Sequence, residues 1–270
     1  MRYIFCFSLF LSAFLFSPLT AQRTFSLSVG GASSYYYGDV TDKLNNALIR
    51  PGLTASGSWY LSPSVSIRLG ISYGMIGAAD SLAGNEARRS RNLSFQSFLG
   101  ELSSVAVWHV LPDKRFGISW VRKPHISPYI FGGIGLFAFD PRTEIHGELV
   151  RLQPLGTEGQ FIQNYGPSRP YRLLQASVPI GGGISVRPGK RWGIRMEAGY
   201  RFSFTDYLDD VSTVYPEPEA LLRIRGAISA ELSNRSGGLV GAGSQRGNPG
   251  AKDGYIFSSL VLVYYFDRFR

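Results

Sequence analysis

The sequence predicts an all-β protein, an eight-stranded antiparallel up-and-down transmembrane β-barrel with long extracellular loops. Three observations predict it: apolar and polar residues alternate with a period of two, short and long connections alternate along the chain, and glycine and aromatic residues are abundant. Glycine accounts for 32 of the 270 residues and aromatic residues for 14%, a mixture typical of strands and tight turns. The 44% of hydrophobic residues excludes an intrinsically disordered chain.

Residues 1–21 are expected to be a secretory signal peptide. The stretch from Tyr3 to Phe16 is almost uniformly apolar, follows a positive charge, and precedes small residues that predict cleavage after Ala21. A membrane-spanning helix is the alternative, but the apolar stretch is shorter than the ~20 residues that a span requires. Residues 22–270 are then expected to form the outer-membrane barrel. Because the single cysteine, Cys6, lies in the signal peptide, we expect no disulfide and no cysteine-based site.

Eight segments are expected to form strands. The clearest are Ser64–Met75 and Arg191–Phe204, where apolar residues alternate with polar residues or glycine over the ~10 residues that a tilted transmembrane strand requires. In the second segment, Ile194 is expected to face lipid and Gly193 to face the lumen. The remaining strands are expected at Phe25–Val29, at Leu53–Leu61 and near 92–110, 126–138, 174–186 and 254–266.

The connections between these segments alternate in length. Tight turns are expected at 61–64 and 187–190, and a connection of medium length at 111–125. Long connections are expected at 35–50, 76–91, 139–173 and 205–253, the last including 216–253 as a long extracellular loop. Outer-membrane barrels have short periplasmic turns and longer extracellular loops, so the short connections and both termini are expected on the periplasmic side.

A soluble barrel such as a lipocalin is the alternative fold, because it produces the same period with its apolar face inside. Two observations favour the membrane. The face opposite the charged residues is continuously apolar and rich in aromatic residues, and all tryptophans fall at or beside the short-turn end, as in an interfacial aromatic girdle. The tryptophans are Trp59, Trp108, Trp120 and Trp192.

The charged residues of the strands are expected to line the lumen. Eight strands enclose a lumen that side chains can fill. Arg195, Glu197 and Arg201 share one face of their strand, as do Arg68 and Glu101 if the register allows. Because an unpaired buried charge is costly, we expect these residues to pair and the barrel to have no diffusion channel.

Catalytic and metal-binding patterns are weak. His109, His125 and His146 lie in different parts of the chain and do not have the spacing of metal ligands. The segments Gly132–Gly135 and Gly181–Gly183 resemble phosphate-binding loops, but neither opens a helix, so close strand packing is the favoured interpretation. We therefore expect no enzyme activity, no cofactor, no metal site and no small-molecule substrate.

Two further binding hypotheses are weak. Asp206, Asp209 and Asp210 would suit calcium, but an acidic cluster without an EF-hand pattern is more often a solvated or turn-capping element. The balance of 28 Lys and Arg against 19 Asp and Glu would suit nucleic acid. Export and the absence of a basic aromatic platform argue against a nucleic-acid partner.

Five segments, in order along the chain, resemble a known family. They are Gly31–Asp39, Arg91–Phe95, Ser127–Gly135, Leu152–Gln160 and Phe204–Asp210. Together they resemble the Bacteroidetes outer-membrane β-barrel family of the type IX secretion system protein PorG, over residues 25–215 and the last strand. The resemblance implies a non-enzymatic subunit of the type IX protein secretion and gliding machinery that docks a periplasmic ring of proteins resembling PorK and PorN. The alternatives are a ligand-binding or adhesin-like barrel and, less favoured, an outer-membrane enzyme.

Basic residues gather at the short-turn end, which is expected to face the periplasm. Clustered charge of one sign steers association and sets specificity, so we predict a partner-docking rim there. The alternative is simple attraction to lipid headgroups of the membrane. The predicted docking residues are Lys114, Arg115, Arg122, Lys123, Arg187, Lys190 and Arg191, with Trp120 as an aromatic anchor.

Overall fold

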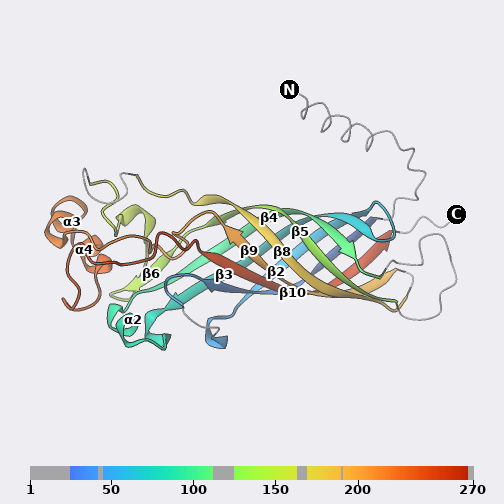
Figure 1. Ribbon diagram of the computed structural model, residues 1–270, viewed down its shortest axis with the longest axis horizontal. Coiled ribbons are helices and arrows are strands. Elements are labelled where there is room, and N and C mark those ends of the chain that lie inside the picture. Colours follow the sequence, from blue (N-terminus) through green and yellow to red (C-terminus); the bar gives the residue numbers. More distant parts are fainter. Residues whose placement is uncertain (1–24, 42–44, 112–124, 163–168, 190, 267–270) are drawn as a thin grey trace, which may run out of the picture.

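The computed structural model describes residues 25–41, 45–111, 125–162, 169–189 and 191–266, and shows a long barrel with a folded cap at one end (Figure 1). The predicted signal peptide lies outside these residues. The barrel strands are β1 (Phe25–Tyr37), β2 (Arg50–Tyr60), β3 (Val65–Ala79), β4 (Ser94–His109), β5 (His125–Phe139), β8 (Leu174–Arg187), β9 (Trp192–Ser203) and β10 (Gly254–Phe266).

These eight strands form a closed antiparallel up-and-down barrel. Each strand pairs with its neighbour in the chain, and β10 pairs with β1 from Phe25 opposite Phe266 to Tyr37 opposite Gly254. The predicted fold class and strand number are therefore confirmed. The largest difference is β1, which continues past Val29 to Tyr37. The apolar–polar alternation does not continue through the second half of β1, because cap residues bury Tyr35 on the outer face as well as Tyr36 on the inner face.

The outer surface of the barrel is apolar along its whole circumference. On β3, Val65, Ile67, Leu69, Ile71, Tyr73 and Met75 are exposed, whereas Ser66, Arg68 and Ser72 are buried inside. On β9, Ile194 is 49% exposed and its neighbour Arg195 only 8%. An apolar exterior around a polar interior identifies a transmembrane barrel of the outer-membrane type and excludes the soluble alternative.

Aromatic side chains surround the short-turn end of this apolar surface. Trp59, Trp108 and Trp192 are all about half exposed. Phe25 contacts Trp59, with ring centroids 5.0 Å apart, and Trp192 contacts Tyr264 at 4.9 Å. The predicted girdle is confirmed for these three tryptophans, whereas Trp120 lies outside the described residues. The girdle marks one boundary of the membrane, at the short-turn end of the barrel.

Inward-facing glycines make room for aromatic rings. A Cβ added to Gly181 would lie 2.5 Å from Cζ of Phe131, and one added to Gly199 would lie 2.7 Å from the same atom. The phosphate-loop interpretation of the glycine-rich strands is therefore replaced by close packing, as predicted, because a side chain at these positions would displace the Phe131 ring from the lumen.

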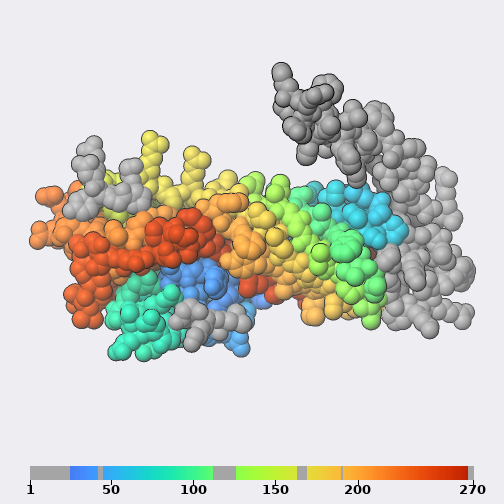
Figure 2. All heavy atoms as spheres, viewed as in Figure 1, coloured from blue at the N-terminus to red at the C-terminus, as the bar shows by residue number. Residues whose placement is uncertain are grey.

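The long connections fold into a cap. They contain the 3₁₀-helices η1 (Asn46–Leu48), η2 (Asp80–Leu82) and η3 (Gln153–Leu155), and the helices α2 (Glu86–Arg91), α3 (Pro218–Arg225) and α4 (Ala227–Ser233). They also contain the hairpin β6 (Arg142–Ile145) and β7 (Glu148–Arg151), which extends β4. Figure 2 shows the last long connection, in orange, as a continuous surface over one side of this end. The described part of the chain contains no helix long and apolar enough to cross a membrane.

One hydrophobic core joins the cap to the adjacent end of the barrel. Its barrel residues include Tyr36 on β1, Phe137 on β5 and Tyr255 on β10, all at most 1% exposed. Cap residues such as Leu208 and Leu232 pack into the same core. The segment 216–253, predicted as a long loop, is therefore a packed element with two helices.

Candidate functional site

The half of the lumen nearer the short turns is filled by a network centred on Glu197. Oε2 of Glu197 accepts hydrogen bonds from Nη1 of Arg68 at 2.7 Å and from the Tyr129 hydroxyl at 2.6 Å. Nε of Arg195 lies 3.5 Å from the same oxygen. The guanidinium of Arg68 also lies 5.0 Å from the centroid of the Phe131 ring. The predicted pairing of lumen charges is confirmed here.

A second network fills the lumen closer to the cap. Arg201 and Glu101 form an ion pair at 3.3 Å, and the Tyr255 hydroxyl donates to Glu101 at 2.8 Å. The Arg201 guanidinium lies 5.1 Å from the centroid of the Phe257 ring. All four side chains are buried, so this network also fills the lumen with side chains.

The centre of the cap is the buried carboxylate of Glu158. It accepts hydrogen bonds from the Ser212 amide at 2.7 Å and the Thr213 hydroxyl at 2.7 Å, and pairs with Nη1 of Arg246 at 3.0 Å. Gly156 precedes it with a φ of 66°, a left-handed conformation that favours glycine and turns the chain inward. Glu158 thereby ties the connection 139–173 to the connection 205–253.

Neighbouring aspartates make the same connection. The Thr157 hydroxyl donates to Asp210, and the Tyr171 hydroxyl donates to the same carboxylate at 2.8 Å. The Tyr36 hydroxyl lies between two other carboxylates, 2.5 Å from Oδ2 of Asp209 and 3.0 Å from Oδ1 of Asp253. The cap therefore ties β1 and the start of β10 to its own interior.

Burial changes the acidity of these aspartates. It raises the pKa of Asp209 to about 8, with a further contribution from the charge of Asp39, and it raises the pKa of Asp210 to about 6. The pKa of Asp253 is also raised, first by burial and then by the charge of Asp209. The Tyr36 hydrogen bond and the Arg91 charge oppose the shift at Asp209. Burial thus favours the protonated form of Asp209 and Asp253, the two acids that share the Tyr36 hydroxyl.

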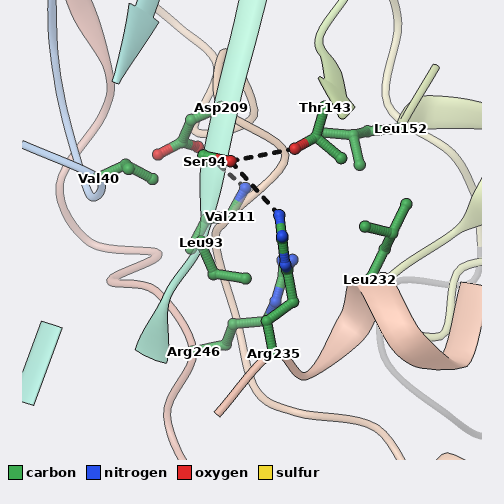
Figure 3. A pocket seen from close by; sticks show the side chains of 10 residues that line it. All are labelled: Val40, Leu93, Ser94, Thr143, Leu152, Asp209, Val211, Leu232, Arg235 and Arg246. Carbon is green, nitrogen blue, oxygen red and sulfur yellow. Dashed lines mark hydrogen bonds between the residues drawn. The ribbon is translucent and has the colours of Figure 1, made fainter. Parts of the chain in front are cut away.

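A small pocket lies between the cap and the barrel (Figure 3). Ser94 of β4 lies at its centre, hydrogen-bonded to Thr143 at 3.2 Å and to Nη1 of Arg235 at 3.4 Å (Figure 3). Its volume is about 10 Å³, room for a single water, whereas pockets for small ligands occupy ~300–1,000 Å³. This pocket therefore has no space for a substrate or cofactor.

The calcium hypothesis also receives no support from the geometry. Within the described ranges, no group of three or more His, Cys, Asp or Glu side chains is placed to hold a metal ion. The acids at 206, 209 and 210 instead bind protein groups: Ser212 donates to Asp206 at 2.7 Å, and the Val211 amide donates to Asp209 at 2.9 Å.

The predicted docking residues are only partly described. Arg191 is exposed at the short-turn end, where its carbonyl accepts a hydrogen bond from the Tyr265 amide. Arg187 differs from the prediction: it is 5% exposed, and its guanidinium lies 3.9 Å from the centroid of the Tyr265 ring, inside the barrel. Its position on an inward-facing site of β8 explains the difference. The other predicted residues, Lys114, Arg115, Trp120, Arg122, Lys123 and Lys190, lie outside the described residues.

The segments of the cap sort their charges in a way that no local sequence pattern predicted. Seven of their acidic side chains are buried, namely Asp80, Asp140, Glu158, Asp206, Asp209, Asp210 and Asp253. Among the basic side chains described in the same segments, Arg246 alone is buried. The exposed surface of the cap is consequently more basic than its sequence. The sequence held one signal of this burial: three acids in 204–210 lie next to Tyr207 and Thr213, whose hydroxyl groups donate to Glu158.

A family model described as a domain of unknown function (DUF6089) matches residues 3–227. No curated protein matches the sequence. The chain is similar to the solved structure of Ail, the attachment invasion locus protein of Yersinia pestis, in complex with the heparin analogue sucrose octasulfate. The TM-score is 0.42 and the identity 13%, over 91% of this chain and 99% of Ail.

Two other solved structures are similar at the same level. The N-terminal β-barrel domain of Pseudomonas aeruginosa OprF has a TM-score of 0.38 and 10% identity, over 92% of this chain and 100% of that domain. Neisserial surface protein A has a TM-score of 0.41 and 7% identity, over 89% of this chain and 95% of that chain.

Proposed function

We propose that this chain is a non-enzymatic outer-membrane barrel that anchors a protein assembly rather than passing solutes. The chain belongs to the family described as a domain of unknown function (DUF6089). The observation that supports it most directly is the filled lumen. Glu197 pairs with buried Arg68 and Glu101 pairs with buried Arg201 across the barrel, and the cap packs over the end with the long connections. A barrel filled in this way has its ends and its outer wall available for interaction.

The assembly we propose is the type IX protein secretion and gliding machinery, with periplasmic ring proteins resembling PorK and PorN as partners. The support is the resemblance of five segments to the PorG-like family. Two of these segments, 152–160 and 204–210, contact each other in the cap: Thr157 donates to Asp210. Both segments that carry the resemblance therefore belong to one packed unit, the cap.

The partner is expected to dock at the periplasmic end. Exposed Arg191 lies there. In the sequence, Lys190 falls in the turn at 187–190, and Lys114, Arg115, Arg122 and Lys123 fall in the connection 111–125 expected at the same end. The extracellular end has its own packed core and no substrate-sized volume in its described pocket. An enzyme active site at that end is correspondingly disfavoured.

Co-purification from outer membranes tests the proposal. Reversal of Lys114, Arg115, Arg122 and Lys123 to glutamate should leave a heat-modifiable, folded barrel but reduce recovery of the periplasmic ring proteins, and wild-type recovery should fall with salt. The matched control reverses four extracellular residues that the structure shows exposed: Arg89, Arg169, Arg223 and Lys252. Recovery that is equal in all three proteins would contradict docking through the basic rim.

A second candidate is an adhesin-like barrel that binds through its cap. It is favoured by exposed apolar side chains on α3 and α4, where Leu222 is 54%, Ile224 49% and Ile228 44% exposed. Substitution of these three residues by serine would abolish adhesion to host or neighbouring cells if this candidate holds. It would leave recovery of the ring proteins unchanged if the secretion role holds.

A further inference from the structure

A cluster of charged side chains lies on the outer face of the barrel where β5 leads into the β6–β7 hairpin. Figure 1 shows β6 at the cap end of the barrel. β6 continues the register of β5 against β4: Phe139 lies opposite Leu99, and Arg142 lies opposite Gln96. The inward positions of β6 are buried, with Thr143 and Ile145 packed against the cap. Asp140 and Arg142 therefore belong to the same outward-facing row as the lipid-facing residues of β5.

Two arginines share the carboxylate of Asp140. Nη2 of Arg142 lies 2.8 Å from Oδ2, and Nε of Arg151 lies 2.8 Å from Oδ1. Arg142 is also directly opposite Arg151 in the hairpin, an arrangement of like charges that destabilises a pair of strands unless an anion compensates it. Asp140 supplies one negative charge for two positive ones. Its side chain is 5% exposed, whereas those of Arg142 and Arg151 are 41% and 50% exposed.

A third arginine lies beside them. The Phe139 amide donates to the Leu173 carbonyl at 3.0 Å, which extends the pairing of β5 with β8 and places Arg172 next to Asp140. Tyr171 and Leu173 pack inward against the cap core, and Arg172 between them is exposed on the opposite, outer side. The backbone register thus places three basic residues, Arg142, Arg151 and Arg172, near one buried acid, Asp140, with exposed Glu144 two residues beyond Arg142 on the same row of β6.

Directly below this cluster the outer face is apolar. Leu174, two residues or ~7 Å along the strand from Arg172, is 63% exposed, and Leu136 is 54% exposed. Leu174 lies opposite Ala138, which lies opposite Gly100, and the space where a Cβ of Gly100 would lie is open. The exposed ring of Tyr73 borders this gap on the next strand. The positive cluster suits the charged headgroup of a lipid, and the gap beside Gly100 and Ala138 suits the acyl chain below that headgroup.

We propose that this cluster binds the phosphate group of a glycolipid in the outer leaflet of the membrane. Guanidinium groups present parallel N–H donors that fit phosphate oxygens, and the exposed part of each arginine leaves donors directed away from Asp140. The acyl chain of the same lipid lies along Gly100 and Ala138. The cluster sits at the extracellular end of the apolar surface, on the side opposite the tryptophan girdle, where outer-leaflet phosphates are located. This inference does not depend on the proposed secretion role.

Binding of lipid A to the folded barrel in detergent micelles, followed by native mass spectrometry, tests the proposal. The probes are diphosphoryl lipid A and the same lipid with both phosphates removed, each with and without excess inorganic phosphate. The test variant carries Arg151→Gln and Arg172→Gln, which leaves Arg142 paired with Asp140 so that the buried carboxylate keeps a partner. The matched control is Arg223→Gln, an exposed arginine of α3.

We expect the wild type and the control to bind diphosphoryl lipid A, and the double variant to bind it about tenfold more weakly while keeping heat-modifiable mobility. The dephosphorylated lipid should bind all three proteins weakly and equally. Equal binding of the two lipids to the wild type, or undiminished binding to the double variant, would overturn the proposal. Complete displacement of the lipid by inorganic phosphate would also overturn it, because the site would then recognise the free anion. A double variant that loses the fold would be replaced by Arg172→Gln alone, with the same expected direction.

Discussion

Removing the charge of Glu197 should destabilise the whole barrel, because this carboxylate compensates two buried arginines. In Glu197→Gln, the Tyr129 hydroxyl keeps an acceptor, the amide carbonyl, but Arg68 and Arg195 lose the negative charge at 2.7 and 3.5 Å. Arg68 is 5% and Arg195 8% exposed, so water does not replace the lost partner. Breaking a buried ion pair on one side typically costs ~3–5 kcal/mol, and we expect a loss of stability in this range.

Equilibrium unfolding in lipid vesicles, followed by tryptophan fluorescence, measures this loss. The matched control is Glu148→Gln on β7, where the same chemical change at an exposed residue should alter the free energy of unfolding by no more than ~0.5 kcal/mol. Arg68→Met combined with Glu197→Gln should recover part of the loss, because Arg68 lies against the Phe131 ring. If Glu197→Gln and Glu148→Gln unfold at the same denaturant concentration, the lumen network does not stabilise the barrel and our reasoning about its charges is wrong.

Two further predictions concern the membrane face and the cap. Met196 is 59% exposed midway between Trp192 and Tyr200, so Met196→Arg should cost ~2–4 kcal/mol, whereas Leu27→Arg near the girdle should cost ~0–1 kcal/mol; equal costs would mean that the membrane boundary lies elsewhere. Burial raises the pKa of Asp209 to about 8, whereas an unfolded aspartate titrates near ~3.9, so the folded cap binds this proton more tightly. The stability that the proton provides is complete below the unfolded value and is lost as the pH rises towards 8. Proteolysis within 205–253 should therefore accelerate across this range and Asp209→Asn should flatten the dependence; a wild-type rate that falls with rising pH would refute the assignment.

The barrel could be predicted from the sequence because one physical rule, alternation between lipid and lumen, acts on every strand. Ser64–Met75 and Arg191–Phe204 satisfied it with few exceptions, and the corresponding strands β3 and β9 lie within a few residues of the predicted bounds. The register followed partly as well: Arg68 and Glu197, 129 positions apart, were placed on the inner face and meet in the lumen.

The cap could not be predicted in the same way, because its structure depends on contacts between residues far apart in the chain. Glu158 contacts Ser212 and Arg246, and no local period identifies such a set. The acids near 206–210 suggested calcium or, more often, a solvated or turn-capping element. The Val211 amide does cap Asp209, but the sequence does not show that the acids are buried among hydroxyl and amide donors. The charge clustering at the periplasmic end also overestimated the rim, because Arg187 turns inward onto Tyr265.

The shared core of cap and barrel has a consequence for the order of folding. Tyr36 and Tyr255, which both belong to that core, come from the first and last strands, whose pairing closes the barrel. The core is therefore incomplete until β10 has joined β1, even though most cap residues precede β10 in the chain. A complete cap core therefore requires the closed barrel. We therefore expect the cap to resist proteases in closed barrels and to be cut in barrels whose first and last strands have not yet paired.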